Sequence, residues 1–266
     1  MKTIDLAFVE GLLTKYQPNP LDQVDEAVSY ALLGGGKRIR PIFLFKTAQL
    51  FGEIDQNVER LAVALEMVHN YSLVHDDLPC MDDDDLRRGK PTCHVKFGDA
   101  TAVLAGDSLL SCAVETIFGG NPSAEYFAAA AYLFAACGRK GMIHGQALDV
   151  AKDFQSVGDL LDIAEHKTAK LFQAALVCPT IYFGADAALI SSFENVARIF
   201  GRVFQIADDL SDSEKPDETS FVSLIGEAQT RALLRKEVDM LFSLCSNIDA
   251  DLSFLTDFCR DIVQKL

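Results

Sequence analysis

The sequence is short of positive charge. It has 24 Lys and Arg residues against 39 Asp and Glu residues, which gives a net charge of −15 at pH 7. A nucleic-acid binding protein needs a basic face, so this composition argues against that class and we expect no nucleic-acid partner. Clustered carboxylates suit another role, because they can hold divalent cations. The simpler alternative, which applies to most of the acidic residues, is that they keep the protein soluble.

Paired cysteines and long apolar segments are also missing. The seven cysteines are scattered and no Cys-x-x-Cys sequence occurs, which indicates reduced, mostly buried thiols in a cytoplasmic protein. Asp5 and Glu10 interrupt the N-terminal region, so we expect no secretory signal. The longest apolar run, residues 127–137, is too short to span a bilayer and predicts a core helix instead.

Strand-like alternation is scarce, whereas helical periodicity is widespread. We expect helices over residues 5–16, 21–33, 42–51, 57–78, 101–118, 124–138, 160–183, 193–210, 221–243 and 247–265. Residues 82–98 are too polar and interrupted to form one helix, and residues 211–220 are expected to form a loop. No linker or charge block marks a boundary, so the sequence predicts a single all-α domain over residues 1–266, built of about ten helices.

An acidic cluster follows the helix expected over residues 57–78. Residues 76–85 contain six aspartates, which repel one another unless cations compensate. An acidic run usually forms a solvated loop. Here it follows an apolar helix, and Pro79 ends that helix, which lets Asp82 turn back toward Asp76.

A second acidic cluster ends another apolar stretch and contains Asp208, Asp209 and Asp212. Asp208 and Asp212 are four residues apart, so a helix would put both on one face. Two such clusters at helix ends suggest facing walls of a bundle cavity with hard cations between them. A set of oxygen ligands without His or Cys favours Mg²⁺, which binds through one or two carboxylates plus substrate phosphates.

Basic residues precede the helix expected at residue 42. Lys37, Arg38 and Arg40 follow a run of glycines, at a position where a helix N-terminus favours anions. The pattern is not a Walker A loop, and alone it could equally be a surface turn. Together with Arg87-Arg88 and His166-Lys167-Thr168, it forms a set of candidates for diphosphate binding. Two basic sets beside two acidic clusters suggest two phosphorylated substrates.

These motifs together resemble those of the trans-polyprenyl diphosphate synthase family, and within it most closely the bacterial farnesyl diphosphate synthases (geranyltranstransferases). The resemblance covers about residues 30–212 and is carried by Gly35-Gly36-Lys37-Arg38-Ile39-Arg40-Pro41, residues 76–88 (DDLPCMDDDDLRR), Gly145-Gln146-Ala147-Leu148-Asp149, His166-Lys167-Thr168, Phe204-Gln205 and residues 208–212 (DDLSD). It implies an isoprenoid-synthase helical bundle around a deep central cavity. It also implies a Mg²⁺-dependent prenyltransferase that condenses isopentenyl diphosphate with dimethylallyl or geranyl diphosphate to make farnesyl diphosphate.

The resemblance also implies roles for individual residues. Magnesium on the allylic diphosphate would be held by Asp76, Asp77, Asp82, Asp208, Asp209 and Asp212. The catalytic set would be Asp76, Asp82, Asp208 and Lys167. The allylic diphosphate would meet Arg87, Lys167, Thr168 and Gln205, and isopentenyl diphosphate would bind to Lys37, Arg40, His69 and Arg88. Without the motif, His69 would be interpreted as a packed core histidine, and Gln146 and Asp149 could equally be surface polar residues.

Product length and assembly also follow from the resemblance. Tyr71 and Ser72 lie five and four residues before Asp76, about one helical turn below the metal site. A bulky residue there accompanies a short product in the family, which favours the fifteen-carbon product over the alternative, geranylgeranyl diphosphate. The family also implies a homodimer.

The sequence departs from the family after Asp212. The family continues with a glycine- and lysine-containing segment and a Gly-Lys-x-Thr motif, whereas this chain has Asp217-Glu218-Thr219 there, with Lys215 the only nearby cation. An alternative is therefore a weakly active or non-catalytic synthase subunit. A terpene cyclase would share the metal chemistry but would have no use for Lys37, Arg40 and His69.

Overall fold

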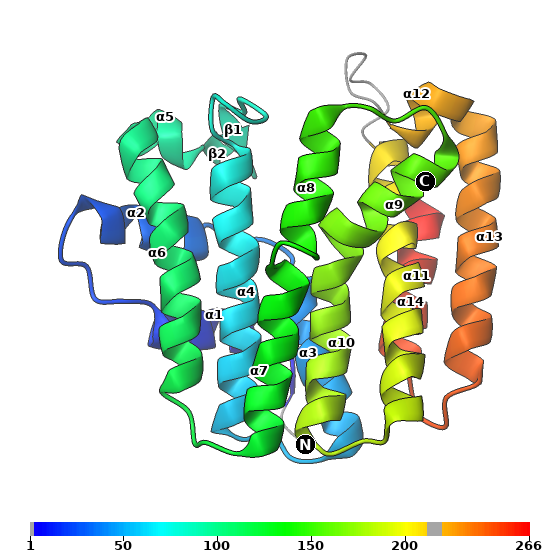
Figure 1. Cartoon of the computed structure of the whole chain (residues 1–266), viewed down its shortest axis with the longest axis horizontal. Coiled ribbons are helices and arrows are strands. Elements are labelled where there is room, and N and C mark those ends of the chain that lie inside the picture. Colours follow the sequence, from blue (N-terminus) through cyan, green and yellow to red (C-terminus); the bar gives the residue numbers. More distant parts are fainter. Residues whose placement is uncertain (1–2, 212–219) are drawn as a thin grey trace. The chain divides into compact units, whose positions relative to one another are not determined.

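The computed structural model describes residues 3–211 and 220–266. The chain divides into two compact units, Met1–Ala130 and Ala131–Leu266. The described residues are almost entirely helical, with a single two-stranded hairpin, which confirms the predicted all-α class (Figure 1). The single domain over residues 1–266 stays a prediction.

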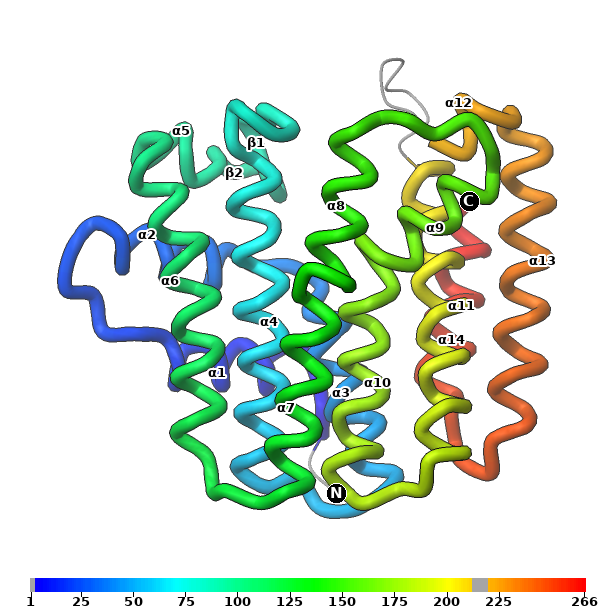
Figure 2. The backbone as a smooth tube through the Cα atoms, viewed as in Figure 1, coloured from blue at the N-terminus to red at the C-terminus, as the bar shows by residue number. Residues whose placement is uncertain are grey.

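The first unit is built around α4, a helix buried on nearly every side. Its helices are α1 (Leu6–Tyr16), α2 (Gln23–Leu32), α3 (Ile39–Phe51), α4 (Gln56–Asp76), α5 (Cys93–Phe97) and α6 (Asp99–Phe118). α4 packs against α6, α3, α2 and α1, so that the acidic cluster extends from the most enclosed helix of the unit (Figure 2). α7 (Ala124–Cys137) carries the chain into the second unit.

The ends of α4 follow from local chemistry. The carboxylate of Asp55 accepts a hydrogen bond from the backbone N–H of Val58 (2.9 Å) and caps the start of the helix. Pro79 disfavours a helical conformation in the residue before it, so the helix ends at Asp76, two residues earlier than the sequence predicts. The backbone N–H groups of Asp77 and Leu78 then bond to Leu73 and His75 and tighten the last turn.

The second unit is arranged around α11. Its elements are α8 (Met142–Ala151), α9 (Val157–Ile163), the π-helical segment η1 (Ala164–Ala169), α10 (Lys170–Tyr182), α11 (Ala187–Ser211), α12 (Phe221–Ile225), α13 (Glu227–Ser246) and α14 (Ser253–Lys265). α11 contacts η1, α10, α12, α13 and α14. The second acidic cluster therefore extends from the central helix of its unit.

Several helices of the second unit differ from the prediction. The sequence predicts no helix where α8 lies, and it predicts one unbroken helix over residues 160–183, which the structure interrupts with the π turn. The helix predicted over 221–243 is broken at Gly226, whose φ of 78° suits glycine. The predicted loop at 211–220 lies mostly outside the described residues.

One helix in the described part of the chain, α6, is long and apolar enough to cross a membrane. Its inner side packs against α4, α2 and α5, and 39% of its apolar window is buried. Its outer side carries Val103, Leu104, Val114 and Phe118, of which Phe118 is 72% exposed. A core helix that is apolar on both its inner and its outer side accounts for this hydropathy.

Candidate active site

The acidic cluster of the first unit folds back on the end of α4. The backbone N–H of Asp82 donates to the carbonyl of Asp76 (2.9 Å), and the N–H of Asp83 donates to the carbonyl of Leu78 (3.2 Å). Asp83 adopts a left-handed conformation with φ of 54°, which closes the turn. The return of Asp82 toward Asp76, which the sequence predicts from Pro79, is therefore present in the backbone.

Asp77 differs from Asp76 in its surroundings. Its side chain is buried and accepts a hydrogen bond from Nε of Arg87 (2.6 Å), within an ion pair that also reaches Asp84. Burial raises the pKa of Asp77, against the opposite effect of the Arg87 guanidinium. Asp77 thus anchors Arg87 to the end of α4 and has little surface available for a ligand.

Arg87 and Arg88 lie on a short hairpin formed by β1 (Leu86–Arg87) and β2 (Lys90–Pro91). Arg88 and Gly89 both have positive φ, as a two-residue hairpin turn requires. The guanidinium of Arg88 donates to the carbonyl of Gly35. A side chain on Gly36 would approach Cζ of Arg88 to 2.6 Å, so this glycine makes room for the arginine.

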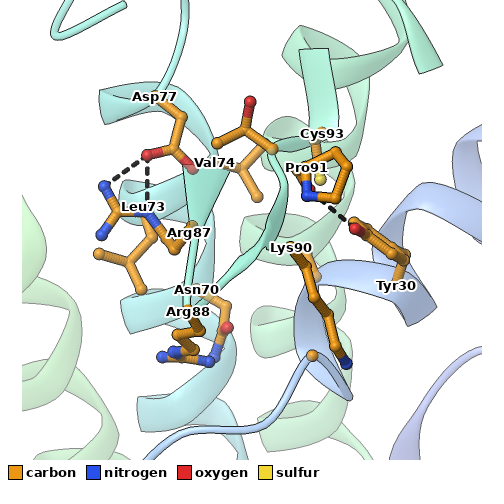
Figure 3. A pocket seen from close by; sticks show the side chains of 13 residues that line it. Tyr30, Asn70, Leu73, Val74, Asp77, Arg87, Arg88, Lys90, Pro91 and Cys93 are labelled. Carbon is orange, nitrogen blue, oxygen red and sulfur yellow. Dashed lines mark hydrogen bonds and ion pairs between the residues drawn. The ribbon is translucent and has the colours of Figure 1, made fainter. Parts of the chain in front are cut away.

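A pocket lies between this hairpin and the helices α2 and α4 (Figure 3). Asp77, Arg87 and Arg88 line one part of it, and the hydroxyl of Tyr30 donates to the carbonyl of Pro91 (2.7 Å) at another. Of the Asp77–Arg87 pair, Arg87 is the member that remains accessible at this pocket, with 32% of its side chain exposed. The hairpin is thus joined to α4 by the ion pair and to α2 by the tyrosine.

The basic motif before α3 divides into buried and accessible cations. Arg38 is buried and pairs with Glu66 and Glu10 (2.7 Å each), and it also donates to the carbonyl of Leu32. Its charge is therefore used within the fold. Lys37 is exposed. The structure thus leaves Lys37 and Arg40 as the substrate candidates of this motif, two of the four residues that the resemblance assigns to isopentenyl diphosphate.

Arg40 and His69 form a pair with a defined hydrogen-bond direction. Nη1 of Arg40 lies 3.2 Å from Nε2 of His69. A guanidinium can only donate, so Nε2 must accept and the proton of the neutral ring lies on Nδ1. Burial and then the charge of Arg40 lower the pKa of His69 well below its ordinary value, which agrees with a neutral ring.

The residues predicted to set product length lie on the last turns of α4. Tyr71 is buried and its ring meets the ring of His75 edge-on, with 5.9 Å between centroids. The hydroxyl of Ser72 donates to the carbonyl of His69 (2.9 Å). His75 donates from Nε2 to the carbonyl of Val103 in α6 (3.0 Å). His75 therefore fixes the end of α4 on α6, a role that sequence reasoning missed.

In the second unit, the predicted substrate residues Lys167 and Thr168 lie on the π turn. Lys167 forms an ion pair with Asp149 of α8, which gives Asp149 a partner where the sequence left a surface role open. The hydroxyl of Thr168 donates to Oε1 of Gln205 (2.8 Å), and Nε2 of Gln205 donates to Oδ1 of Asp209 (2.9 Å).

The second acidic cluster repeats the division seen in the first. Asp208 is exposed, whereas Asp209 accepts hydrogen bonds from Gln205 and from the backbone N–H of Phe221 (2.9 Å each). Asp212 lies outside the described residues. In both clusters the first aspartate is the more accessible one and the second is used to hold neighbouring parts of the chain.

The donor set fits magnesium that arrives with a substrate. Among residues 3–211 and 220–266, no three His, Cys, Asp or Glu side chains converge into a cage for a metal ion. Mg²⁺ keeps several waters and binds in proteins through one or two carboxylates together with substrate phosphates. Accessible carboxylates at Asp76, Asp82 and Asp208 are suited to that mode.

Comparisons with known proteins support this interpretation. The family model described as polyprenyl synthetase matches residues 22–220. A farnesyl diphosphate synthase from Micrococcus luteus is 37% identical over 86% of this chain and 84% of its own length. A chloroplastic geranylgeranyl pyrophosphate synthase from Capsicum annuum is 41% identical over 81% of this chain, which spans 59% of that protein.

A solved structure has the same fold. The apo crystal structure of an FPP/GFPP synthase from Zymomonas mobilis superimposes with a TM-score of 0.88 at 35% identity, over 96% of this chain and 95% of that one. The fold is therefore the helical bundle of the isoprenyl synthases, as the resemblance implied. The matched range contains both acidic clusters, both basic sets and the π turn. The chain therefore belongs to the polyprenyl synthetase family of prenyltransferases.

Proposed function

We propose that the protein is a Mg²⁺-dependent farnesyl diphosphate synthase, which condenses isopentenyl diphosphate with dimethylallyl or geranyl diphosphate. The observation that carries the proposal is the repeated division within the acidic pairs. Asp76 and Asp208 are accessible, while Asp77 and Asp209 hold Arg87 and Gln205. This arrangement supports a role for Asp76 and Asp208 as ligands of a magnesium diphosphate. It also supports a role for Asp77 and Asp209 in holding the side chains that would bind the diphosphate.

In this proposal Asp76, Asp82 and Asp208 would hold Mg²⁺ on the allylic diphosphate, supported by Asp77, Asp209 and Asp212. Arg87, Lys167 and Thr168 contact its oxygens. Magnesium supplies charge neutralisation of the leaving diphosphate when it is bound. Fixed cations stabilise the negative charge that develops as the allylic C–O bond breaks.

Isopentenyl diphosphate binds separately through Lys37, Arg40 and Arg88 in this proposal. Neutral His69 accepts from Arg40 and holds its guanidinium in place. The double bond of isopentenyl diphosphate attacks the allylic cation and forms the new C–C bond. A proton then leaves the product carbon, and the released diphosphate accepts it, so no strong protein base is required. Apolar helices around the reaction exclude water, which would otherwise trap the cation.

The product length has two candidates. The buried tyrosine at residue 71 supports the fifteen-carbon product, since a large side chain one turn below the metal would limit the space for the chain. The Capsicum relative supports the twenty-carbon alternative. The test is an assay with purified protein, Mg²⁺, isopentenyl diphosphate and either dimethylallyl or geranyl diphosphate, with the product length determined. No condensation product would contradict the proposal and favour a non-catalytic subunit.

We also propose that the protein is a cytoplasmic homodimer. The apolar outer side of α6, with Phe118 72% exposed, supports an isologous contact with a second copy. Burial of that face in a dimer would also explain why a helix of this hydropathy needs no membrane. Light scattering at micromolar concentration tests the assembly, and a monomer would contradict it.

A further inference from the structure

The π turn, Ala164–Ala169, is enclosed between two helices that both place a glycine against its backbone. A side chain on Gly145 of α8 would overlap the backbone nitrogen of Lys167 and lie 2.6 Å from its Cα. A side chain on Gly201 of α11 would overlap Cβ of Ala169 and lie 2.9 Å from its backbone nitrogen. The obstructing atoms belong mostly to the backbone, so no rotamer change could relieve the overlap.

Conformation does not explain these glycines. Both lie inside helices and neither has a positive φ, so their backbones would accept alanine. A glycine inside a helix costs about 1 kcal/mol relative to alanine. The cost is offset by the close approach that only glycine permits.

Each glycine is followed four residues later by an acceptor for the π turn. Four residues after Gly145, the carboxylate of Asp149 holds the ammonium of Lys167. Four residues after Gly201, the amide oxygen of Gln205 accepts from the hydroxyl of Thr168 (2.8 Å). Positions i and i+4 lie on one face of a helix. On that face, each helix therefore offers a glycine against which the backbone of the π turn can pack and an acceptor for a side chain of the π turn.

We propose that Gly145 and Gly201 are positioning residues for diphosphate binding. They set the depth at which the π turn lies between α8 and α11, and this depth places the ammonium of Lys167 and the hydroxyl of Thr168. The inference rests on the proposed function, in which these two groups contact the allylic diphosphate. Single π turns inside helices are frequently found at functional sites, and this one requires tertiary contacts to hold its wide turn.

The test compares wild type with Gly145→Ala, Gly201→Ala and the matched control Gly158→Ala. Gly158 lies in neighbouring α9, where an added Cβ would meet only Oγ of Ser156 at an ordinary 3.4 Å. Binding of inorganic diphosphate with Mg²⁺ is measured by calorimetry, and hydrogen exchange is measured at residues 164–169. Both measurements report on the π turn and do not require catalytic turnover.

We expect Gly145→Ala and Gly201→Ala to weaken magnesium diphosphate binding about ten- to hundred-fold, the loss of one charge-assisted contact. Exchange at residues 164–169 should accelerate in both, whereas Gly158→Ala should match wild type. In steady-state assays the KM for geranyl diphosphate should rise with the KM for isopentenyl diphosphate unchanged. In a Lys167→Ala background, Gly145→Ala should add little, because the glycine acts through that lysine.

Faster exchange with unchanged diphosphate binding would overturn the proposal, because the glycines would then serve packing alone. Equal losses for both substrates would also overturn it. If the glycine variants do not fold, Gln205→Ala tests the contact between α11 and the π turn without adding volume. This variant is measured alone and in a Thr168→Val background. Additive effects of these two changes would overturn the proposal. A wild type that makes no prenyl product would contradict the proposed function, while diphosphate binding and exchange would still decide this inference.

Discussion

His69→Gln is expected to remove a pH dependence from the stability of the protein. The ring of His69 accepts a hydrogen bond from the guanidinium of Arg40, so it is neutral and surrounded by positive charge. Its folded-state pKa is lowered well below 6.5 by burial and then by Arg40 and its neighbours. Protonation would remove the acceptor and place a second charge beside the arginine.

The sign follows from linkage. The unfolded chain binds a proton to His69 near pH 6.5, whereas the folded chain resists protonation until a lower pH. Stability from this group is therefore complete above about pH 6.5, the unfolded-state pKa, and is lost progressively as the pH falls from there toward the lower folded-state pKa. For one proton excluded from the folded state, the loss between about pH 8 and about pH 5.5 reaches about 1.4 kcal/mol.

Urea denaturation of wild type and His69→Gln across this pH range measures the effect. Glutamine keeps an oxygen acceptor for Arg40 and does not titrate, so the difference between the two proteins isolates the histidine. We expect the wild type to lose about 1.4 kcal/mol more than the variant on acidification. A difference in unfolding free energy that stays constant with pH would refute the assignment of a neutral, acceptor His69.

Further predictions address the metal, the product and the assembly. Asp76→Ala or Asp208→Ala should lower turnover by orders of magnitude with an unchanged circular dichroism spectrum, and near-normal activity would contradict their role. Tyr71→Ala should lengthen the product toward twenty carbons, and an unchanged product distribution would assign length control to another residue. We expect the KM of the wild type for geranyl diphosphate to be about one to two orders of magnitude above that of the family, since the sequence lacks one lysine for a charge-assisted contact. Glu218→Lys should lower this KM part of the way back. A wild-type KM typical of the family that Glu218→Lys does not change would disprove this prediction. Light scattering should give a dimer, whereas Phe118→Asp should shift it toward monomer.

The parts of the site that the sequence could predict depend on local chemistry. Pro79 ends α4 and brings the chain back, so the approach of Asp82 to Asp76 follows from neighbouring residues alone. The extent of α4 was also predictable within two residues at either end. In these segments the local preference and the tertiary structure agree.

The parts that the sequence could not predict depend on distant partners. The π turn has the same apolar pattern as an ordinary helix, and its extra residue is held by contacts with α8 and α11. α8 contains a glycine, Gly145, in its interior, which lowers its helix propensity. Arg38 resembles an anion-binding residue locally, yet Glu66 takes its charge from 28 positions away. A glutamate within the apolar stretch of α4 was the signal available for that pair.

The paired aspartates show why a motif cannot be interpreted as a set of equal ligands. Successive residues of a helix are rotated by about 100°, so two adjacent carboxylates cannot face the same ligand from the same side. At the end of α4, Asp76 remains the more accessible residue, while Asp77 turns into the protein and anchors Arg87. At the end of α11, Asp208 is exposed, while Asp209 holds Gln205 and the start of α12. Loss of the first aspartate would remove a ligand, whereas loss of the second would release the groups that surround it, so equal losses of activity at the two positions would have different physical causes.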